Sequence, residues 1–251
     1  MSQETIDHII TFSWDNFSGE VIMSLFVMII ICILSFLIYF KFRNADPTKP
    51  NGGFVLVVET IVDKVESFTV ELMGNRRREF AGYVMAVGSY ILLSFLVSLI
   101  GFPGPLTYLG NTFSIALCTF GLIHFTAMKN NKWGYFKRFI DPIPVLLPVN
   151  LLSMWAPLLS LSLRLFGNAL AGFTLMSIVY YALGNLSSMI FGFLPAGLSS
   201  IILPPIITPV LHLYFDVFSG VIQTLIFVML TMIFVAQEDP EEEIIENATL
   251  K

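Results

Sequence analysis

One arginine, Arg164, stands in the middle of an apolar run that extends from about Val145 to Leu183. A guanidinium at the centre of a bilayer costs roughly 2.5–3.5 kcal/mol on insertion scales, so an arginine at that depth indicates a functional site. It stays protonated at physiological pH and cannot relay a proton. The chemistry it predicts is electrostatic. At about 4 Å from a carboxylate and an effective dielectric constant of about 20, it favours the ionised carboxylate by about 4 kcal/mol before desolvation is subtracted.

Polar residues repeat at helical spacing around this arginine. Ser160, Arg164 and Asn168 fall at positions i, i+4 and i+8, which places them on one face of a helix. Small residues keep the surface beside this stripe low, so that another helix can approach closely: Gly167, Ala171 and Gly172. Two simpler roles stay open, namely a backbone hydrogen bond for Ser160 and an interhelical hydrogen bond for Asn168.

A second polar group lies on the last apolar segment. Asp216 and Gln223 are seven residues apart and share a helix face, with Ser219 and Gly220 between them and His212 one turn earlier. A carboxylate can take up and release protons, so Asp216 is a candidate relay. The alternatives are a structural pair between Asp216 and Arg164, a hydrogen-bonding role for Gln223, and a place for His212 at the outer membrane interface.

The two polar groups resemble one known family. The run SLSLRLFGNALAG around Arg164 is similar to the signature of subunit a of the F-type ATP synthase, and Asp216 and Gln223 match that family's second polar helix. The resemblance implies two long, nearly horizontal helices beside a rotor ring of carboxylate-bearing helices. Protons would enter from outside near Asp216 and leave near Ser160, and Arg164 would ionise the ring carboxylate and block direct leakage.

The resemblance also implies the partners. They are the rotor ring, the peripheral stalk subunit b, the rest of the ATP synthase and the lipid bilayer, and the subunit itself would have no catalytic residues, no metal site and no cofactor. One position departs from the pattern. Many family members carry a carboxylate or histidine shortly after the arginine motif, and this chain has Phe173 there. The resemblance therefore leaves open which group completes the outer half-channel.

Composition independently predicts an integral membrane protein. The chain has 251 residues, of which 56% are hydrophobic and 12% charged, and its mean hydropathy is +0.81. About a quarter of the residues of a soluble domain are charged. The basic residues flank apolar runs, which argues against a nucleic-acid role. No phosphate-binding glycine loop occurs in the sequence, so any nucleotide would be bound by another subunit.

The apolar runs predict an all-α fold with about five membrane-embedded helices. The first is 21–40, a transmembrane hairpin occupies 83–128, and two long helices that form the proton path occupy 145–236. The connecting segments are an acidic N-terminal stretch at 1–20, a loop with an amphipathic helix at 41–82, a second loop at 129–144 and an acidic tail at 237–251. A packed linker is the alternative to the amphipathic surface helix.

Charge predicts the orientation. Apart from Arg164 and Lys251, every Lys and Arg lies within residues 41–83 and 129–141, which are on the same side of the membrane. By the positive-inside rule that side is cytoplasmic, so the N-terminus faces outward and the acidic C-terminal tail is cytoplasmic. The expected location is the bacterial plasma membrane, with multiple crossings.

The last two apolar runs are too long to stand upright. Residues 145–183 would span about 58 Å as a helix, and 206–236 about 46 Å, against a hydrocarbon core of about 30 Å. These helices must therefore be strongly tilted, or kinked at Pro148, Pro157 or Pro209. A secondary transporter should show paired repeats, which are not visible here. A purely structural scaffold would not explain Arg164 and Asp216.

Overall fold

All regular structure in the described part of the chain is helical. The computed structural model describes residues 19–43, 53–101, 103–131, 147–193 and 195–238. Five of its helices are long and apolar enough to cross a membrane. The predicted all-α membrane fold is therefore confirmed. The expectations for 1–18, for 239–251 and for most of the 129–144 loop lie outside the described residues.

The helices follow one another with few interruptions. The first half contains α2 (Gly19–Arg43), α3 (Gly53–Met73), the 3₁₀ turn η2 (Asn75–Phe80), α4 (Ala81–Ser98), the 3₁₀ turn η3 (Pro105–Thr107) and α5 (Leu109–Asn131). The second half contains α7 (Leu147–Ile190), α8 (Ala196–Ser199), α9 (Pro204–His212), the π-helical turn η5 (Leu213–Phe218) and α10 (Ser219–Ala236).

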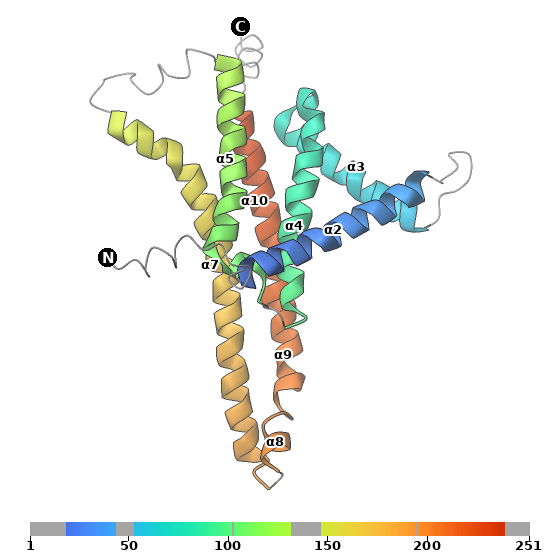
Figure 1. Ribbon diagram of the computed structural model, residues 1–251, viewed down its shortest axis with the longest axis vertical. Helices are drawn as coiled ribbons and strands as arrows, with labels where there is room; N and C mark the ends of the chain where they lie inside the picture. Colours follow the sequence, from blue (N-terminus) through green and yellow to red (C-terminus); the bar gives the residue numbers. More distant parts are fainter. Residues whose placement is uncertain (1–18, 44–52, 102, 132–146, 194, 239–251) are drawn as a thin grey trace, which may run out of the picture.

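Helices α4, α5, α7 and α10 enclose the core. Their large apolar side chains are buried together, because each helix directs one apolar stripe inward. The cluster comprises Ile91 and Phe95 of α4, Leu106 of η3, Ala116 of α5, Leu158, Leu161, Leu165 and Ala169 of α7, and Phe227 of α10. In Figure 1, α5 and α10 run alongside each other, and the C-terminal arm of α7 continues beside α9. This packing fixes which face of α7 stays outside the fold.

Helix α2 lies at the edge of this bundle. It projects obliquely away from the bundle in Figure 1, and most of its apolar side chains are exposed. Val27 is fully buried, and the Ser24 hydroxyl hydrogen-bonds the Tyr90 hydroxyl of α4 at 2.8 Å. A surface this apolar suits lipid or a membrane partner.

Helix α3 packs on the bundle at one end only. Its C-terminal end packs on α4 and α10 through Met73, which is buried beside Val84 and Met232. Its N-terminal half leaves large apolar side chains exposed, including Phe54 and Ile61. The helix is thus anchored at one end and presents an apolar surface at the other.

The two long apolar segments differ in how they accommodate their length. Helix α7 is continuous over 44 residues, contains Pro157 and changes direction part-way along (Figure 1). A proline inside a helix removes one backbone donor and promotes such a bend. The last segment is instead divided into α9, the turn η5 and α10, with Pro209 inside α9. The predicted bending is confirmed for α7, whereas the π-helical turn was not foreseen.

Candidate functional site

Arg164 lies on the outer surface of the fold. Its residue is exposed, while Leu161 and Leu165, which face the core, are almost fully buried. Its guanidinium donates one long hydrogen bond, of 3.4 Å, to the Ser160 hydroxyl. The described residues place no Asp or Glu in ion-pair contact with it. Among the described residues, Arg164 is thus a guanidinium without a carboxylate partner, with Ser160 one helical turn away.

The small residues next to Arg164 divide between two environments. Gly167 and Ala171 are exposed on the same side of α7 as Arg164. Gly172 is buried inside the chain, and a Cβ there would lie 4.0 Å from the Cβ of Phe215. Close approach of another helix remains a prediction, and its most accessible positions are Gly167 and Ala171.

Asn168 joins α7 to α10. Its amide nitrogen donates to the side-chain oxygen of Gln223 at 2.5 Å. Gln223 is only 1% exposed, and its amide nitrogen is buried without a hydrogen-bond partner among the described residues. The interhelical hydrogen bond considered for this pair is therefore present. This hydrogen bond holds Gln223 of α10 against Asn168, which lies one helical turn beyond Arg164 on α7.

Asp216 belongs to a separate polar cluster. The π-helical turn η5 places its carboxylate against the ring nitrogen Nδ1 of His212, one turn earlier. The other ring nitrogen, Nε2, is 2.9 Å from the Tyr180 hydroxyl of α7. Asp216 is 6% exposed. Its bonded partner is thus His212, and not Arg164, which removes the structural pair considered from the sequence.

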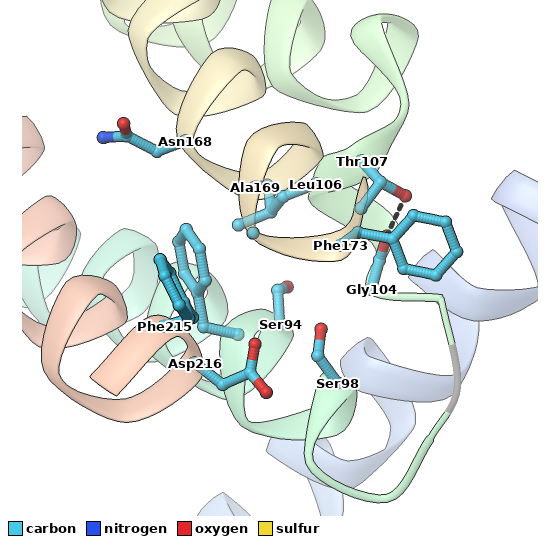
Figure 2. Close-up of a pocket in the computed structure, with 12 residues that line it drawn as sticks. Ser94, Ser98, Gly104, Leu106, Thr107, Asn168, Ala169, Phe173, Phe215 and Asp216 are labelled. Atoms are coloured by element: carbon cyan, nitrogen blue, oxygen red, sulfur yellow. Dashed lines mark hydrogen bonds between the residues drawn. The ribbon is translucent and has the colours of Figure 1, made fainter. Parts of the chain in front are cut away.

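A cavity lies directly beside Asp216. It is small, about 10 Å³, and lies between the end of α4, η3, α7 and η5. Figure 2 shows Asp216 and Ser94 facing the same space, with Phe173 across from them. The Ser94 hydroxyl is buried and has no hydrogen-bond partner among the described residues. Two polar groups that face one small space are what a bound water requires.

Phe173 lines this cavity and offers no titratable group. Ser177, which could have served in its place, gives its hydroxyl proton to the Phe173 carbonyl at 2.9 Å. The polar neighbours of Asp216 come instead from His212 and, through it, Tyr180. The spacing of four between His212 and Asp216 could have revealed their contact. Tyr180 and Ser94 carry no comparable sequence signal, because their positions depend on tertiary packing.

The polar side chains of the site gather in two regions. In the described part of the chain, no group of three or more His, Cys, Asp and Glu side chains could hold a metal ion. Asp216, the Ser94 hydroxyl and the cavity form one polar region, and Arg164 with Ser160 forms another. The Asn168–Gln223 hydrogen bond lies between them along α7. The site thus consists of two polar regions separated along α7.

Comparison with known proteins gives a consistent set of relatives. The sequence profile described as ATP synthase A chain matches residues 21–236. ATP synthase subunit a of Mycoplasma genitalium is 36% identical, over 87% of this chain and 79% of that protein. The Mycoplasma pneumoniae protein of the same name is 34% identical, over 84% and 75%. A subunit a from Propionigenium modestum, described as sodium ion specific, is 29% identical, over 75% and 64%.

Proposed function

Because this chain belongs to the ATP synthase A chain family, as the ion-translocating stator subunit of Fo, we propose that the ion it conducts is the proton and that two offset half-channels meet at Arg164. The chain is part of the F-type ATP synthase complex, whose catalytic sites lie in F1 and not in this subunit. Family membership also removes the transporter and scaffold alternatives.

The observation that supports this mechanism best is the environment of Arg164. An exposed guanidinium in the middle of a long apolar helix, without a carboxylate from the described chain, needs an anionic partner in the membrane. We assign that partner to a carboxylate on the rotor ring. The low surface at Gly167 and Ala171 lets a ring helix approach α7 closely.

The outer half-channel is built from Asp216 and its cavity. A proton taken up there passes to a ring carboxylate and neutralises it, so that this ring helix can turn into lipid. Asp216 lies on the α9 side of Gln223, and the basic turn η2 lies at the other end of the bundle (Figure 1). If η2 is cytoplasmic, as the positive-inside rule favours, Asp216 is nearer the outer surface.

The inner half-channel begins near Ser160. After almost a full turn of the ring, the carboxylate reaches the aqueous path on this side and loses its proton. Arg164 then stabilises the ionised form, by about 4 kcal/mol at 4 Å and an effective dielectric constant of about 20. The same fixed charge repels a proton that would cross directly between the half-channels. Each charge moved is worth about 2.3 kcal/mol per 100 mV.

The remaining surfaces fit the expected surroundings. We assign the exposed apolar sides of α2 and α3 to lipid and to the peripheral stalk subunit b. The location follows as the bacterial plasma membrane, with the N-terminus outside and the C-terminus in the cytoplasm.

The test is ATP-driven proton pumping by membrane vesicles that carry the whole complex. Arg164→Ala should abolish pumping, while the amount of assembled complex and the ATPase activity of detached F1 stay largely unchanged. Leu163→Ala is the matched control, because Leu163 is the adjacent residue and is 54% exposed. Pumping by Arg164→Ala near the wild-type rate would overturn the mechanism. Uptake of Na⁺ in place of H⁺ would overturn the choice of ion.

A further inference from the structure

Asp216 has a connected polar path on one side. The Asp216 carboxylate contacts His212, and His212 contacts the Tyr180 hydroxyl, so three titratable groups from η5, α9 and α7 form a continuous chain. The chain leads from the buried carboxylate, through a histidine side chain that is 18% exposed, to a tyrosine that is 43% exposed. Exposure thus rises with each step away from Asp216.

The direction of this path is away from Arg164. His212 and Tyr180 both lie on the α8 side of Asp216, because His212 precedes Asp216 in the chain and Tyr180 is 16 residues beyond Arg164 on α7. In Figure 1, α8 lies with the C-terminal end of α7 and the N-terminal end of α9 at one end of the molecule, and the start of α4 lies toward the other end. The cavity with Ser94 lies on another side of Asp216, toward Asn168.

The atoms are arranged for proton transfer. In the neutral imidazole one nitrogen donates a hydrogen bond and the other accepts one. The form with the proton on Nδ1 satisfies both neighbours, since Nδ1–H donates to the ionised carboxylate and Nε2 accepts from the Tyr180 hydroxyl. Histidine changes its protonation near neutral pH more readily than any other side chain, which suits it to a shuttle.

We propose that His212 is the proton carrier at the outer mouth of the channel, taking protons from the outer aqueous phase through Tyr180 and delivering them to Asp216. This proposal rests on the proposed function. It assigns to His212 and Tyr180 a part of the path that Phe173 cannot supply.

The transfer balances at each atom. The Tyr180 hydroxyl gives its proton to Nε2 of His212 and takes a proton from a hydronium ion on its exposed side, which leaves water. The Nδ1 proton then moves to the Asp216 carboxylate, which becomes a neutral carboxyl group. One proton has entered at Nε2 and one has left at Nδ1, so the imidazole ends neutral. Exchange with water returns it to the starting tautomer.

The test uses the intact ATP synthase in vesicles, with ATP synthesis driven by an imposed proton gradient from the outer side. His212→Gln keeps a polar side chain but cannot shuttle a proton, so the rate should fall at least about tenfold, given the 10²–10⁴-fold contribution of positioned proton transfer. Imidazole added on the outer side should restore part of the rate. Tyr180→Phe should give a smaller loss. Tyr181→Phe is its matched control, since Tyr181 is the neighbouring residue and is 76% exposed.

The outcomes separate this proposal from the function on which it rests. Wild-type synthesis by His212→Gln, or a loss that imidazole does not restore, overturns the shuttle. If the His212→Gln complex fails to assemble, the Tyr180→Phe variant tests the shuttle instead. A rate of ATP synthesis for Tyr180→Phe equal to that of Tyr181→Phe overturns the shuttle. Asp216→Asn tests the underlying half-channel. If Asp216→Asn is inactive and His212→Gln is normal, the half-channel stands without the shuttle, whereas a normal rate for Asp216→Asn contradicts both.

Discussion

At the scale of single residues, charge placement decides function. Arg164 is the only Asp, Glu, Lys or Arg among the 44 residues of α7, and it lies on a face that the other described residues leave uncovered. The structure instead satisfies Asp216 internally, through His212. Arg164 therefore needs a partner group outside the described chain, whereas Asp216 is already held in place. This asymmetry matches a fixed charge and a proton carrier.

The Asn168–Gln223 pair predicts unequal effects of two substitutions on stability. Asn168→Leu leaves the Gln223 amide buried with both ends unbonded, which costs about 1–3 kcal/mol. Gln223→Leu should cost less, because Asn168 is exposed on α7. The double variant should lose less than the sum of the two. The measurement is the temperature at which the complex dissociates on native gels, and strictly additive losses would contradict the coupling.

The sequence was informative about residues that are close in the chain. Helical spacing placed Ser160 with Arg164, and the structure joins them by a hydrogen bond. It also placed Asp216 and Gln223 on one face, and both are buried. Tyr180 was not predicted, because its contact with His212 spans 32 residues and depends on how α7 packs on α9. The environment of Phe173 was out of reach for the same reason.

At the scale of helices, the contact between α10 and α4 depends on one glycine. A Cβ on Gly220 would lie 2.7 Å from the Cβ of Phe95, which is too close for two non-bonded carbon atoms. Gly220→Ala should therefore force the two helices apart and reduce the amount of assembled complex. Overpacking of this kind typically costs about 1–3 kcal/mol. Immunoblots of washed membranes measure the effect.

A second glycine supplies the matched control. Gly88 lies on α4 and also faces α10, but its added Cβ would meet Val228 at an ordinary distance of 3.6 Å. Gly88→Ala should assemble normally. Equal amounts of the Gly220→Ala and Gly88→Ala proteins would show that the close α4–α10 contact is not required.

The π-helical turn η5 predicts sensitivity to deletion. It adds backbone to the helix between His212 and Ser219, and such turns are frequent at functional sites. Removing Leu213, which is 63% exposed, should convert η5 to regular α-helix and bring His212 one residue closer in sequence to Asp216, which changes how their side chains align. Proton pumping should then fall strongly, whereas Leu213→Ala should pump normally. Normal pumping by the deletion variant would show that the turn has no such role.

Helix existence was predictable and helix shape only partly so. Apolar runs of sufficient length identified five candidate spans, because length and composition suffice for that. Excess length and Pro157 together predicted a bend in α7. The periodicity of the sequence does not predict the π-helical turn at Leu213–Phe218, because such a turn depends on tertiary packing.

At the scale of the whole molecule, basic residues predict the orientation. Arg76, Arg77 and Arg78 gather in η2, whereas the α7–α8 connection contains no Lys or Arg. A membrane-impermeant maleimide should label Phe193→Cys from outside only and Glu79→Cys from the cytoplasm only, in a background without Cys32 and Cys118. Phe193 is 82% exposed, so access should not limit labelling. The opposite pattern would reverse the assignment of the two half-channels.

The exposed apolar surfaces of the molecule have neighbours that the sequence of this chain does not by itself identify. Large apolar surfaces on α2, on α3 and along the Arg164 face of α7 remain uncovered. In a membrane some of this surface meets lipid, but the guanidinium requires a partner. Composition predicts that a surface is apolar. Whether that surface contacts lipid or another protein depends on the charged residue within it.

The most direct measurement is disulfide crosslinking between this subunit and the rotor ring in membranes, again without Cys32 and Cys118. Cysteines at Gly167 and Ala171, exposed beside Arg164, should crosslink to a cysteine next to the ring carboxylate. Cysteines at Leu165 and Ala169, buried against α5 and α10, should not. Crosslinks confined to the buried positions, or none at the exposed ones, would contradict the claim that Arg164 faces a carboxylate of another chain.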